Sequence, residues 1–144
     1  MSPDDLLRPG LKGEAEVVVA ENHTAPHVGS GRVHVLATPV MVNLMEAAAL
    51  HAVEGLLAAG QQTVGTHLDI THTAATPVGM RVKACAELVK VEQRRMVFRV
   101  YAEDEEERIG EGIHERIIIS LDRFDRRMQE KSRRCALKRA SGGT

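Results

Sequence analysis

One apolar stretch constrains the fold of this chain more than any other feature. It reads LATPVMVNLMEAAALHAVEGLLAAG from residue 36 to residue 60. Thr38 is a suitable N-cap, Pro39 a suitable first helical residue and Gly60 a suitable stop, so we predict a helix of about twenty residues. Because this helix is apolar on nearly every side, we expect other structure to enclose it.

The rest of the chain supplies segments with the two-residue alternation of strands. In RVKACAELVKVE every second residue from Val82 to Leu88 is apolar, and RRMVFRVYAED alternates in the same way around Phe98. GEAEVVVA before the helix, and QTVGTHLDITHTAA and RIGEGIHERIIIS after it, read as further strands. One central apolar helix with several long alternating strands predicts an α+β fold, in which an antiparallel sheet wraps around the long helix.

Length and charge limit the domain count and the classes of partner. The 144 residues suffice for one domain with a real core, and the net charge of −1 gives no reason to expect nucleic acid or a membrane surface. From Asp122 onward, eight Lys/Arg stand against three Asp/Glu, a net charge of +5 that leaves −6 for residues 1–121. We therefore divide the chain into a domain, residues 1–121, and a basic C-terminal helix and tail, residues 122–144.

The cellular compartment is indicated by the two cysteines and by the N-terminal sequence. Cys85 and Cys135 fit neither a metal-binding spacing nor a disulfide framework, which favours a reducing cytoplasmic setting. The opening MSPDDLLRPG lacks the basic end and apolar run of a signal peptide, and no window has the length and purity of a membrane span.

The carboxylate of Glu46, in VNLMEAAAL, is the most unusual group in the predicted helix. It either faces a loop, a partner or exposed backbone, or it acts as a general base or nucleophile whose surroundings tune its basicity. Thr38 has a structural role as helix cap. The same helix end presents free N–H groups that can polarise a carbonyl, so the two roles are compatible.

Histidines are numerous, and one of them is placed for chemistry. His72 lies in DITHTAATPVG, near a strand end, where it could act in acid–base chemistry if Glu46 is close. His67 and His72 are an odd number of residues apart and would face opposite sides of a regular strand, so we predict no metal site. His114, in GIHERIII, is expected to serve the sheet.

Three motifs, in this order, resemble a known family. ATPVMVNLMEAAAL, VGTHLDITHTAATPVG and GEGIHERIII are similar to the fluoroacetyl-CoA thioesterase-like family of hotdog-fold proteins, and the resemblance runs from about residue 14 to residue 120. It implies a hotdog fold, a long helix wrapped by an antiparallel sheet. It also implies acyl-CoA thioester hydrolysis by a homodimer, without a cofactor.

The resemblance assigns roles to five residues of this chain. The catalytic threonine, glutamate and histidine of the family fall on Thr38, Glu46 and His72. Its substrate-contacting glycine and arginine fall on Gly65 and Arg116, although Arg116 could equally be a salt-bridging strand residue.

Helix geometry adds an independent constraint. Thr38 and Glu46 are eight residues apart, or about 12 Å along a helix axis, so they cannot touch within one chain. A site that uses both the helix start and Glu46 therefore needs a second copy, and we predict a twofold homodimer with two equivalent sites at its interface.

The favoured reaction is hydrolysis of a short acyl-CoA thioester, in which Glu46 is base or nucleophile. A hotdog-fold enoyl-CoA hydratase or dehydratase and a non-catalytic acyl-thioester binder stay open as alternatives. The expected lid, residues 21–37, contains no Phe, Tyr or Trp, so an aromatic gate is hard to build and selectivity for fluoroacetyl is not predicted.

Overall fold

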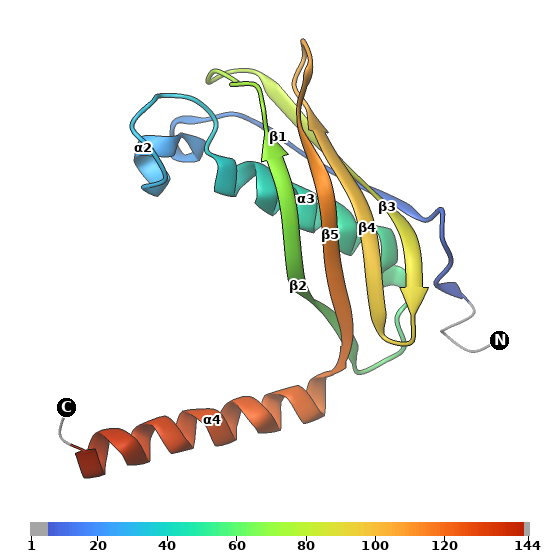
Figure 1. Ribbon diagram of the computed structural model, residues 1–144, viewed down its shortest axis with the longest axis vertical. Helices are drawn as coiled ribbons and strands as arrows, with labels where there is room; N and C mark the ends of the chain where they lie inside the picture. The colour runs from blue at the N-terminus through green and yellow to red at the C-terminus, as the bar shows by residue number, and fades with distance from the viewer. Residues whose placement is uncertain (1–5, 143–144) are drawn as a thin grey trace.

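The computed structural model describes residues 6–142, in which a five-stranded antiparallel sheet curls over one long helix (Figure 1). The helix is α3 (Thr38–Val53), and the strand order is β1-β3-β4-β5-β2. The strands are β1 (Lys12–Val18), β2 (Gln61–His72), β3 (Arg81–Glu92), β4 (Arg95–Glu103) and β5 (Arg108–Ser120). The predicted α+β fold, with an antiparallel sheet around a central helix, is confirmed.

The core lies between α3 and the face of the sheet that the alternation predicted. Val82 and Leu88 of β3 and Phe98 of β4 are completely buried, as are Met41 and Met45 of α3. Burial of such side chains supplies the main driving force for the fold. On its other side, α3 keeps Asn43 and His51 exposed, so the sheet encloses only one face of the helix within a single chain.

Both ends of α3 differ from the sequence prediction. The N-cap is Ala37, in extended backbone, and Thr38 is the first helical residue; no side chain caps this end. Thr38 does not act as the cap because its hydroxyl bonds a histidine ring instead. The α-helix ends at Val53 and a 3-10 turn, η2 (Glu54–Leu56), follows, so the helix is sixteen residues long and stops before Gly60.

The segment before α3 is irregular apart from two short turns of helix. These are η1 (Glu21–His23) and α2 (Ala25–Val28), which ends at Gly29 in the left-handed conformation. A bridge between Thr24 and Leu36 closes the segment on itself. It therefore forms a compact flap beside the start of α3 (Figure 1).

The two edge strands of the sheet have different characters. β1 is seven residues long and turns Lys12, Glu14 and Glu16 to solvent, and such charges oppose pairing with another chain. β2 is twelve residues long, mostly exposed, and carries the 43% exposed Leu68. An exposed edge of this length is suited to pairing with a further strand.

Helix α4 (Leu121–Gly142) leaves the end of β5 and projects away from the sheet (Figure 1). None of its residues is buried. The predicted C-terminal helix is therefore present, and the domain boundary at residue 121 stays a prediction. Within residues 6–142, no helix has the length and apolar character needed to cross a membrane.

Candidate active site

Glu46 contacts an arginine across the gap between α3 and the sheet. Its Oε2 lies 3.7 Å from Nη1 of Arg116, which projects from β5. The Glu46 side chain is 38% exposed and the Arg116 side chain 8%. The carboxylate therefore lies beside a buried cation at the open side of the helix.

Arg116 is held in one orientation by two neighbours. Its Nε donates to the hydroxyl oxygen of Thr63 at 2.9 Å, and its Nη2 donates to the Thr63 carbonyl at 3.1 Å. Its Nη1 lies 3.2 Å from Nε2 of His114. Together these bonds fix the planar guanidinium of Arg116 in an orientation in which Nη1 faces Glu46.

The hydrogen bonds of His114 define its tautomer. Its Nδ1 lies 2.9 Å from the carbonyl oxygen of His67, which can only accept, so Nδ1 carries the proton. Nε2 is then the acceptor for Arg116. Burial and, secondarily, the Arg116 charge lower the pKa of His114, in keeping with a neutral ring.

Gly65 lies against these side chains. A Cβ at this position would be 3.2 Å from Oε2 of Glu46, 3.1 Å from Cε1 of His114 and 3.5 Å from Nη1 of Arg116. The missing side chain therefore leaves the carboxylate accessible from β2.

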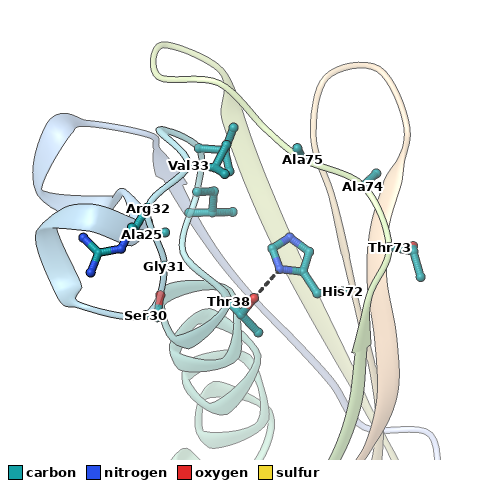
Figure 2. A pocket seen from close by; sticks show the side chains of 12 residues that line it. Ala25, Ser30, Gly31, Arg32, Val33, Thr38, His72, Thr73, Ala74 and Ala75 are labelled. Carbon is teal, nitrogen blue, oxygen red and sulfur yellow. Dashed lines mark hydrogen bonds between the residues drawn. The ribbon is translucent and has the colours of Figure 1, made fainter.

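Thr38 and His72 form a second group at the start of α3. The Thr38 hydroxyl lies 2.7 Å from Nδ1 of His72, at the end of β2 (Figure 2). They line a cavity of about 320 Å³, together with apolar residues such as Val33 and Leu36 of the preceding segment. This volume is sufficient for a small acyl group.

Two polar groups beside this cavity make no hydrogen bond by geometric criteria within residues 6–142. Nε2 of His72 is buried and has no hydrogen-bond partner within residues 6–142. Burial lowers the pKa of His72, partly opposed by the Ala74 carbonyl, so the ring is neutral at neutral pH. Pro39 has no N–H, and those of Val40 and Met41 bond to Ala37, whereas the N–H of Thr38 makes no backbone hydrogen bond in the described chain.

The structure thus places the five predicted residues in two groups. Thr38 and His72 form one, and Glu46, Gly65 and Arg116 form the other. No hydrogen bond or ion pair within residues 6–142 joins Glu46 to His72.

Two further residues, Thr63 and His114, belong to the second group but were not predicted as site residues. Both contact Arg116: the register between β2 and β5 brings Thr63 to it, whereas His114 lies two residues before it on β5. The close spacing of His114 and Arg116 on one strand is the signal that could have identified His114.

Comparisons with known proteins identify a family that the sequence matches. The model of the fluoroacetyl-CoA-specific thioesterase family matches residues 19–122. A fluoroacetyl-CoA thioesterase of Streptantibioticus cattleyicolor is 45% identical over 98 residues, which are 68% of this chain and 70% of that protein.

Solved structures of the same family also match this chain. The structure of the fluoroacetyl-CoA thioesterase FlK matches with a TM-score of 0.82 at 38% identity, covering 87% of this chain and 97% of that one. A variant of FlK has been solved in complex with acetyl-CoA. A hot-dog-like protein from Thermanaerovibrio acidaminovorans matches with a TM-score of 0.82 at 21% identity, covering 91% and 97% of the two chains, which confirms the hotdog fold.

Proposed function

The chain belongs to the fluoroacetyl-CoA-specific thioesterase family, and from this membership we propose that it hydrolyses short acyl-CoA thioesters at a site shared by two copies. The general activity, hydrolysis of an acyl-CoA thioester bond, follows from the family. The observation that best supports this site is the pairing of an accessible carboxylate, Glu46, with the fixed cation of Arg116.

The proposed chemistry uses both groups of residues. The thioester oxygen lies at the start of α3, where the Thr38 N–H and hydroxyl stabilise the charge that develops on it. Glu46 either takes a proton from a water molecule, which adds to the acyl carbon, or attacks the acyl carbon itself to form a mixed anhydride, which water then hydrolyses to the free acid and the Glu46 carboxylate. In both routes the C–S bond breaks, the sulfur leaves as thiolate and takes up a proton, and His72 orients the acyl group or the water.

A homodimer is needed to bring the two groups together. Thr38 and Glu46 are separated by about 12 Å along α3, so one chain cannot offer both to one carbonyl. Pairing of the exposed β2 edge with that of a second copy would bring a second α3 toward the open side of Glu46. Each site would then take its carboxylate from one copy and its helix start from the other.

For the acyl group of the substrate, we propose a short chain and no particular chemical identity. The segment 21–37 has no aromatic side chain, and the cavity beside Thr38 is lined mainly by small and aliphatic residues. We therefore assign no preference for fluoroacetyl over acetyl. A cytoplasmic setting is proposed as well, since Cys85 and Cys135 are both free thiols.

A thiol-release assay tests the proposal. Acetyl-, fluoroacetyl-, propionyl-, medium-chain and aromatic acyl-CoAs are incubated with the enzyme and free CoA is measured. We expect turnover of the short saturated substrates. Water addition to an enoyl-CoA without thiol release would show a hydratase. Binding without turnover across the panel would show an acyl-thioester binder.

A further inference from the structure

A separate cavity of about 280 Å³ lies where β5 ends and α4 begins. It is lined by β5 from Ile117 to Ser120 and by three arginines, Arg94, Arg123 and Arg127. Arg94 lies in the turn between β3 and β4, which Figure 1 places at the same end of the sheet as the start of α4. The two helix arginines are four residues apart and so share one face of α4.

The charge of this cavity is not balanced by the protein. Arg81, Arg95 and Arg108 of the sheet each pair with a glutamate. By contrast, the arginines of this cavity make no ion pair within residues 6–142. No carboxylate lines the cavity, and the guanidinium of Arg127 only lies over the Phe124 ring, at 5.8 Å. Three unpaired guanidiniums around one hollow form a site for a group with several negative charges.

We propose that this arginine pocket (Arg94, Arg123 and Arg127) binds the phosphate groups of CoA. This inference rests on the proposed function, because it takes an acyl-CoA as the substrate. Arginine is suited to phosphate because its planar fork matches two phosphate oxygens at once. Ile117, the half-buried isoleucine of the cavity, adds an apolar surface against which the adenine ring packs.

The position of the arginine pocket fits the length of the substrate. Ile119 lies three residues beyond Arg116 on β5, or about 10 Å along the strand. The pantetheine arm between the thioester and the diphosphate is long enough to cover this interval. The thioester thus lies near Glu46 while the nucleotide reaches the end of the sheet.

Enzyme kinetics with two substrates, one with and one without the CoA phosphates, test this assignment. The variant Arg94→Gln/Arg123→Gln/Arg127→Gln is compared with Arg133→Gln/Arg134→Gln/Arg139→Gln, which loses the same charge from exposed positions of α4 outside the cavity. Both are assayed with acetyl-CoA and with acetyl-pantetheine, which lacks the nucleotide. We expect the first variant to raise KM for acetyl-CoA about tenfold or more, with kcat and the acetyl-pantetheine KM unchanged.

Three results would overturn the assignment. They are an unchanged KM for acetyl-CoA, an equal rise in the control variant, or a parallel rise in KM for acetyl-pantetheine. If the wild-type enzyme turns over neither substrate, the proposed function fails by itself. Calorimetry with free CoA then decides: selective loss of binding in the first variant supports the arginine pocket, and equal binding by both variants rejects it.

Discussion

At the scale of single residues, the central feature is a carboxylate whose surroundings are held rigid. Thr63 and His114 fix the Arg116 guanidinium, and its Nη1 faces Glu46. Fixed groups stabilise charge without reorganising during the reaction, which is where much enzymatic rate acceleration originates. The catalytic role proposed for Glu46 would therefore depend on Thr63 and His114, which hold Arg116 in place.

Glu46→Gln tests that role. The amide keeps the size of the side chain but removes the negative charge, so it can neither accept a proton nor attack the acyl carbon. We expect turnover to fall about 10²- to 10⁴-fold with a modest change in KM. Glu54→Gln, an exposed residue of η2, serves as the control and should keep full activity. Near-normal hydrolysis by the Glu46 variant would refute the assignment.

Gly65→Ala tests the fit between β2 and the carboxylate. The added methyl group would lie 3.2 Å from Oε2 of Glu46 and must displace it. Since small displacements of reacting groups are costly, we expect kcat to fall by about tenfold to a hundredfold. At Gly55 an added Cβ meets no atom within 4 Å, so Gly55→Ala is the matched control. Equal kcat in both variants would contradict the close approach.

Single residues also show where sequence patterns stop being informative. Glu46 stood out because a carboxylate is rare in an apolar helix, and the structure places it beside Gly65 and Arg116. Thr38 was wrongly predicted as an N-cap, because the local pattern does not include its partner His72, thirty-four residues away. Side-chain partners from distant strands cannot be derived from local spacing.

At the scale of elements, alternation and periodicity predicted most of the architecture. The buried faces of β3 and β4 are those that the two-residue pattern indicated. Helix ends were less predictable, since α3 stops at Val53 although apolar residues continue to Ala59. The α-helix gives way to the 3-10 turn η2, which contains Gly55, a residue that disfavours a continued helix.

The contact between α3 and β1 makes a prediction about stability. A Cβ on Gly13 would lie 2.1 Å from the Ala48 carbonyl oxygen and 2.5 Å from the Ala52 nitrogen, so the helix backbone must shift. We expect Gly13→Ala to lower the free energy of unfolding by about 2 kcal/mol or more. Thermal unfolding measures this, with Gly31→Ala as control, where the nearest atom is 3.5 Å away. An unchanged melting temperature would disprove the close contact.

At the scale of the whole molecule, the β2 edge is the proposed dimer interface. Leu68→Arg puts a charge on an exposed apolar position of this edge, and we expect it to give monomers with little activity. Val18→Arg makes the same change on β1, the other edge strand, at a residue that is 50% exposed, and should leave the dimer intact. Analytical ultracentrifugation distinguishes the two, and an active Leu68→Arg monomer would end the shared-site proposal.

The stability of the molecule should fall in weak acid. Burial lowers the pKa of His72 and His114 below the ordinary value of 6.5, so the unfolded chain takes up protons first. The contribution of these two histidines to the free energy of unfolding is therefore fully present above about pH 6.5. It is lost as the pH falls toward their folded-state pKa values. Melting temperatures across this range measure the decline, and His72→Asn should make it shallower. An unchanged slope in that variant would assign the decline to other groups.

Close contacts at two glycines also limit which part of the enzyme can move. At Gly13, α3 lies directly on β1, and at Gly110 the Met41 sulfur lies 2.7 Å from where a Cβ would be. The helix is thus anchored to the sheet at two points and has little freedom to swing. We therefore expect release of the acid from the cavity beside Thr38 to require movement of the flap, residues 21–37, which lines that cavity.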